Sequence, residues 1–133
     1  MIVHPLRLRP GQDLKQAIQD YADRHAIRAG WVMTCVGSLT DLHLRYANQP
    51  EGTPQRGHFE VVSLVGTVST AGCHLHLCVS DERGHTIGGH LLDHNLVYTT
   101  AEIVLGESPY HIFSRELDGT TPYPELQIAP RID

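Results

Sequence analysis

Residues 74–105 read HLHLCVSDERGHTIGGHLLDHNLVYTTAEIVL, and this stretch decides the fold. From His74 to Ser80 polar and apolar residues alternate, which is typical of a strand with one buried face. The residues DERG at 81–84 have the composition of a hairpin turn, and residues 85–92 return as a second strand. Residues 95–105 are a longer apolar and β-branched run. The stretch therefore predicts successive antiparallel strands.

The residues before this stretch predict one helix and one edge strand. Residues 2–9 alternate like a strand, and Pro5 favours an edge position because proline cannot donate to a sheet. Apolar residues then recur at three- and four-residue spacing, which predicts a helix over 13–27. Asp13 is suited to cap its start, and Gly30 lies beyond its end.

The remaining segments also favour strands. An apolar run at 31–36 and an alternating segment at 42–46 come before an exposed loop at 48–57. Residues 59–68 are expected to form a further strand pair with a kink at Gly66. The tail from about residue 108 carries four prolines and is expected to pack loosely over the surface. The fold class predicted is α+β: one domain spanning 1–133, with a mostly antiparallel sheet or partial barrel and one main N-terminal helix against it.

Composition limits the classes of function. The chain has 133 residues, a net charge of −5, one lysine and 10 histidines. Nucleic-acid binding depends on clustered Lys and Arg, so an acidic, histidine-rich chain is a poor candidate for direct contact with DNA. Three cysteines without close pairs fit free thiols in a reducing compartment. With no secretory leader and no long apolar run, a cytoplasmic protein without a membrane segment is expected.

The histidines gather where the sheet pattern is clearest. His74 and His76 alternate along one strand, so both imidazoles face the same side with their roots roughly 6–7 Å apart. The turn at 81–84 sends the next strand back, and His90 follows Gly88-Gly89 on it. Three imidazoles with an open fourth position are the ligand set of catalytic zinc sites. His74, His76 and His90 are therefore a candidate metal site, and Zn²⁺ is the candidate ion.

Each of these residues also has an interpretation that requires no metal ion. In a chain with 10 histidines, a His-x-His pair also arises by chance on a solvated sheet face. Cys78 shares the parity of His74 and His76, so it is either a fourth ligand or a small buried residue. Glu60 and Glu102 interrupt apolar strands and either face solvent or line a polar cleft as a general base.

Several blocks together resemble a known family, the plants and prokaryotes conserved (PPC) domain. The resemblance covers about residues 4–118, and its strongest parts are the HLH, GGHL and GxFE segments. The blocks are RLRPGQDL at 7–14, AGWVMTCVGSLTDLHLRYA at 29–47, GHFEVVSLVGTVS at 57–69 and the stretch at 74–105.

The resemblance implies a sheet of about seven strands with helices beside it, assembled as a homotrimer. It also implies that the three histidines match a cluster that looks like a metal site in bacterial members. Plant members contact DNA through an AT-hook, whose Arg-Gly-Arg-Pro core is absent here because Arg7-Leu8-Arg9-Pro10 lacks the glycine. The DNA-binding description given to bacterial members therefore has no physical support in this sequence.

Three functions follow as hypotheses. The first is a homotrimeric assembly or binding module with a three-histidine metal site, in which an exposed apolar surface at Phe59, Val61 and Leu64 is buried between copies. The second is a zinc-dependent hydrolase that uses the same histidines, with Glu60 or Glu102 as the base. The third, a DNA-binding protein, has only the family description in its favour.

Overall fold

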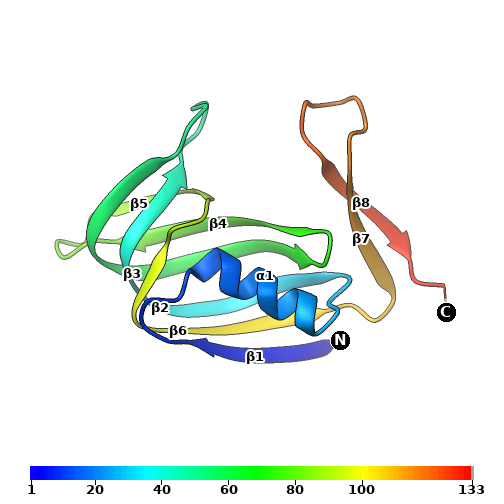
Figure 1. Cartoon of the computed structure of the whole chain (residues 1–133), viewed down its shortest axis with the longest axis horizontal. Helices are drawn as coiled ribbons and strands as arrows, with labels where there is room; N and C mark the ends of the chain where they lie inside the picture. The colour runs from blue at the N-terminus through cyan, green and yellow to red at the C-terminus, as the bar shows by residue number, and fades with distance from the viewer. Residues whose placement is uncertain (133) are drawn as a thin grey trace.

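The computed structural model describes residues 1–132 and contains one helix and eight strands (Figure 1). The elements are β1 (Ile2–Leu8), α1 (Leu14–Arg24), β2 (Gly30–Arg45), β3 (Thr53–Ser69), β4 (Gly72–Ser80), β5 (Thr86–Leu91), β6 (Leu96–Glu107), β7 (His111–Glu116) and β8 (Glu125–Pro130). The α+β prediction is confirmed, with one strand more than the family resemblance implies. Within residues 1–132, no helix is long and apolar enough to cross a membrane.

Six strands form one antiparallel sheet in the order β1-β6-β2-β3-β4-β5. An additional pairing joins Leu44 and Arg45 of β2 to Leu91 and His90 of β5, so β2, β3, β4 and β5 close on themselves as a small barrel. β1 lies at the free edge, as Pro5 predicts. The barrel closure brings Arg45 at the end of β2 beside His90 of β5, although these residues are 45 positions apart in the chain.

Helix α1 is shorter than the sequence pattern predicts. The Asp13 side chain caps it by accepting hydrogen bonds from the backbone N–H groups of Lys15 and Gln16, both at 3.1 Å. The helix ends at Arg24 because Ala26 has a positive φ of 51°. Its buried face, Leu14, Ile18 and Ala22, packs on the sheet, across which α1 lies in Figure 1.

Strands β2 and β3 are each one long, bent strand where the sequence suggests two shorter ones. β3 also begins at Thr53, inside the predicted loop. It passes through Gly66, where φ is +141° and a Cβ atom would lie 2.0 Å from the carbonyl oxygen of His74. Only glycine fits there, and it lets β3 bend while staying paired with β4 beside His74.

The apolar surface predicted at Phe59, Val61 and Leu64 is not exposed. These side chains are 7%, 8% and 4% exposed and belong to the core of the single chain. A register shift between Val61 and Ser63 explains the spacing, because this bulge returns Leu64 to the inner face. The same shift leaves Val62 57% exposed on the outside.

The C-terminal tail is ordered, in contrast to the loose packing that its prolines predict. β7 and β8 pair in register from His111–Pro130 to Glu116–Glu125 and form a separate two-stranded sheet. Figure 1 shows this hairpin standing beside one end of the main sheet. The backbone N–H of Phe113 donates to the carbonyl of Arg28 at 2.9 Å, and this contact helps to fix the base of the hairpin.

Candidate metal centre

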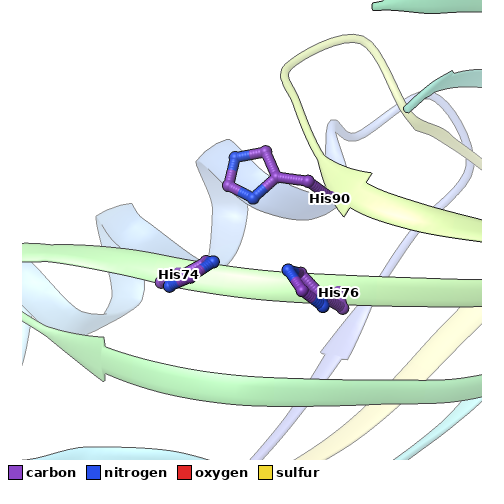
Figure 2. A group of neighbouring side chains, drawn as sticks. All are labelled: His74, His76 and His90. Carbon is purple, nitrogen blue, oxygen red and sulfur yellow. The ribbon is translucent and has the colours of Figure 1, made fainter. Parts of the chain in front are cut away.

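Two neighbouring strands bring the three predicted histidines together. His74 and His76 lie on the same side of β4, and the register of the β4–β5 pair places His90 directly opposite His76. The intervening turn is held by Asp81, whose carboxylate accepts from the backbone N–H groups of Arg83 (2.8 Å) and His85 (2.9 Å). Figure 2 shows the three rings gathered over β4 and β5.

The ligand-capable nitrogens of His74, His76 and His90 all lie within 4.8 Å of one another. The ring centroids are 5.1 to 5.7 Å apart. Around a tetrahedral ion with His N–Zn bonds of about 2.05 Å, ligand nitrogens lie about 3.3 Å apart. Small side-chain rotations can supply the difference, because His74 and His76 are exposed on one side. The residues therefore fit a metal ion bound by three imidazoles.

The environment favours the neutral form of two of these imidazoles, His74 and His90, and the neutral imidazole is the form that binds metals. Partial burial, followed by the charge of His74 and then that of Arg45, lowers the pKa of His90 to about 4. The pKa of His74 is also lowered, first by partial burial and then by the charges of His76 and Arg115. At neutral pH these two histidines can therefore bind a metal ion without first losing a proton.

The structure places the other candidate residues elsewhere. Cys78 is on β4 opposite Gly88, half-buried, and is not among the groups whose ligand atoms converge. Glu60 and Glu102 are exposed on β3 and β6. Within residues 1–132, the walls of the cavities beside the histidines contain Glu125 but neither of these two carboxylates.

Sequence reasoning missed the charged groups around the cluster. Arg45 comes from the end of β2, and Arg115 and Glu125 come from the β7–β8 hairpin. Together they form part of the wall of a cavity of about 510 Å³ that also includes His74 and His90. Nothing in the local sequence marks them, because strand closure and hairpin docking join segments far apart in the chain.

The sequence model of the Plants and Prokaryotes Conserved (PCC) domain matches residues 1–109. The chain is 48% identical over 128 residues to the bifunctional protein GlmU of a Synechococcus strain. This match covers 96% of the chain but 20% of the GlmU protein, so the chain spans about a fifth of the length of that relative.

Two solved structures extend the likeness to the whole fold. A hypothetical protein from Salmonella enterica is 44% identical, has a TM-score of 0.96, and the match covers 98% of this chain and 95% of that one. A metal-containing protein from Archaeoglobus fulgidus is 25% identical, has a TM-score of 0.77, and the match covers 96% of this chain and 94% of that one.

Proposed function

The chain belongs to the Plants and Prokaryotes Conserved domain family, and on this premise we propose that it is a metal-binding module that assembles as a homotrimer. His74, His76 and His90 would hold one divalent transition-metal ion, with Zn²⁺ as the first candidate because three imidazoles suit it. The observation that carries the proposal is the convergence of three imidazoles from two paired strands.

A metal ion held by three histidines keeps a position for a further ligand. There it would act as a Lewis acid toward an oxygen ligand. The chain's own contribution is to fix the rings: β4 and β5 hold all three on one side of the sheet, where two of them remain exposed. We do not assign hydrolysis, because Glu60 and Glu102 lie away from the cluster.

The test is the metal content of protein purified without a polyhistidine tag. We expect about one transition-metal ion per chain by elemental mass spectrometry. His90→Ala removes one of the three ligands, and we expect it to lower metal affinity at least a hundredfold, more than the loss of an outer-shell partner does. The matched control is His111→Ala in the hairpin, which should keep its metal. Trace metal in the unmodified protein, unchanged by His90→Ala, would refute the metal site.

The trimer proposal is supported by apolar side chains on the outer face of the main sheet. Val36, Val62 and Tyr98 are 57%, 57% and 46% exposed on β2, β3 and β6. Exposed apolar groups of this kind are buried when identical copies associate. Light scattering should give a mass near three times 14.8 kDa, and Val36→Glu should shift it toward the monomer. A monomer at micromolar concentration would rule the trimer out.

A further inference from the structure

Two arginines lie on either side of the histidine cluster, and different parts of the chain supply them. Arg45 is the register partner of His90 across the β2–β5 pair, so both side chains lie on the same face of the sheet. Thr67 is the register partner of His74 across the β3–β4 pair. The Arg115 guanidinium donates a hydrogen bond from Nη2 to Thr67 Oγ1 at 2.9 Å.

Neither guanidinium is neutralised by an acidic partner. In the part of the chain that the structure describes, no carboxylate oxygen lies within 4.0 Å of the side-chain nitrogens of Arg45 or Arg115. Arg45 donates to the backbone carbonyl of Gln49 at 3.5 Å, and Arg115 to the hydroxyl of Thr67. Glu125 is the single acidic residue in the cavity wall, so two cations face one anion even before a metal ion adds its charge.

The cavity has the size and the walls of a small-molecule site. Its volume of about 510 Å³ falls within the usual range for pockets that hold small ligands. Beyond the charged groups, the wall is apolar or aromatic and includes Pro50, Tyr123 and Pro124. A ligand that complements both the arginines and the apolar wall has an anionic group and an apolar organic group.

We infer that this cavity binds a small organic carboxylate, with its carboxylate group between Arg45, Arg115 and the metal held by the histidines. The inference rests on the proposed metal site and names the class of ligand that site takes. The planar guanidinium group matches a carboxylate through paired N–H donors, which fits two arginines at one head group. The organic body packs against Tyr123 and the prolines.

A carboxylate suits the cavity better than a phosphate does. Glu125 shares the wall and repels a dianion more than a monoanion. An inorganic phosphate also leaves the apolar wall formed by Pro50, Tyr123 and Pro124 without a partner. Inorganic phosphate is therefore the competing ligand that the experiment must include.

The experiment begins with the measured metal content of the tag-free protein and uses benzoate, acetate and inorganic phosphate as probes. Each is titrated into the zinc-loaded protein by calorimetry and into the cobalt-loaded protein by visible absorption, which responds when an anion enters the metal's coordination shell. We expect saturable binding of benzoate that is tighter than that of acetate or phosphate. Tighter binding of phosphate than of benzoate would overturn the carboxylate assignment.

The variants R45Q and R115Q remove one guanidinium each and leave the three histidines in place. Each should weaken benzoate binding about tenfold or more, because a hydrogen bond between charged groups is lost, while metal content stays unchanged. The matched control, R83Q, lies in the exposed turn between β4 and β5 and should bind as the unmodified protein does.

The two proposals fail in different ways. A protein that holds metal but binds no benzoate, or binds it equally well in R45Q and R115Q, overturns the carboxylate site and leaves the metal site standing. A protein without metal refutes the metal site. Benzoate binding to that metal-free protein, weakened by both arginine variants, would still support the arginine pocket, and its absence would overturn it.

Discussion

The main sheet and the β7–β8 hairpin are stabilised by different kinds of interaction. The buried apolar core runs from Leu8 to Leu105, so every one of its residues lies in the first part of the chain. Every residue of β7 and β8 is half-buried or exposed, and Ile128 is 62% exposed. The sheet is held by its own core, whereas the hairpin is held by its ladder and by a few polar contacts at its base.

Both regions contribute residues to the candidate site. The proposed metal ligands His74, His76 and His90 come from the sheet, but Arg115 and Glu125 come from the hairpin. The match to the family model ends at residue 109, just before the hairpin. The part of the chain that matches the family model thus carries the proposed metal ligands, while the segment after it contributes Arg115 and Glu125 to the wall of the cavity beside them. We therefore expect the hairpin to adjust ligand binding at the site and to be unnecessary for metal binding.

The largest expected effect comes from truncating equivalent leucines in the two regions. Leu77 on β4 is 2% exposed, and we expect Leu77→Ala to lower the free energy of unfolding by about 2–5 kcal/mol through lost burial and a cavity. Leu126 on β8 is half-buried, and Leu126→Ala should cost less than about 1 kcal/mol. Urea denaturation of both variants measures the difference.

Equal losses would contradict the division between the two regions. They would mean that the hairpin folds as part of the same cooperative unit and shares its apolar stabilisation. Metal content supplies a second readout: if the hairpin only tunes the site, Leu126→Ala should retain metal at the level of the unmodified protein.

Much of the part of the site that lies on the main sheet could be predicted from the sequence. The spacing of His74 and His76, and the turn before His90, were enough to predict the cluster because strand parity and a short hairpin are local properties. Arg45 and Arg115 could not be found this way, since their positions depend on barrel closure and hairpin docking. The outward face predicted for Phe59, Val61 and Leu64 was wrong, because alternation does not tell which face is inside and a bulge shifts it.

The tail shows a second limit of local patterns. Prolines at 109, 122, 124 and 130 predicted loose packing, yet they lie at the ends or outside of β7 and β8, where they interrupt few ladder bonds. The alternating character lies in β8, where polar Glu125 and Gln127 alternate with apolar Leu126 and Ile128, and the flanking prolines obscured it.

A smaller expected effect is a pH dependence of stability that arises from the histidine cluster on the main sheet and not from the hairpin. His90 has a folded-state pKa of about 4, below the ordinary histidine value near 6.5, so the unfolded chain binds more protons between these pH values. Metal-free protein should therefore lose stability as the pH falls from about 6.5 to 4. Urea midpoints measured in EDTA at pH 7, 6, 5 and 4 test this, and His90→Gln should flatten the profile.

The hairpin supplies the control for the pH profile. His111→Gln changes a histidine of β7 whose Nδ1 lies 2.7 Å from the Ser108 hydroxyl, away from the cluster. It should leave the acid-dependent loss of stability in place. A profile that stays unchanged in His90→Gln would show that other groups cause the acid sensitivity.

The smallest expected effect concerns the contact that joins the two regions at the site. Thr67→Val removes the hydroxyl that accepts the Arg115 hydrogen bond, at a cost of about 0.5–1.5 kcal/mol. Because the sheet keeps its own core, we expect little change in the urea midpoint but faster hydrogen exchange over residues 111–116 and a few-fold weaker benzoate binding. If Thr67 acts by orienting Arg115, then adding Thr67→Val to R115Q should weaken binding no further. Additive losses, or unchanged exchange in the hairpin, would mean that the Phe113–Arg28 backbone contact fixes the hairpin and that Thr67 does not position the arginine.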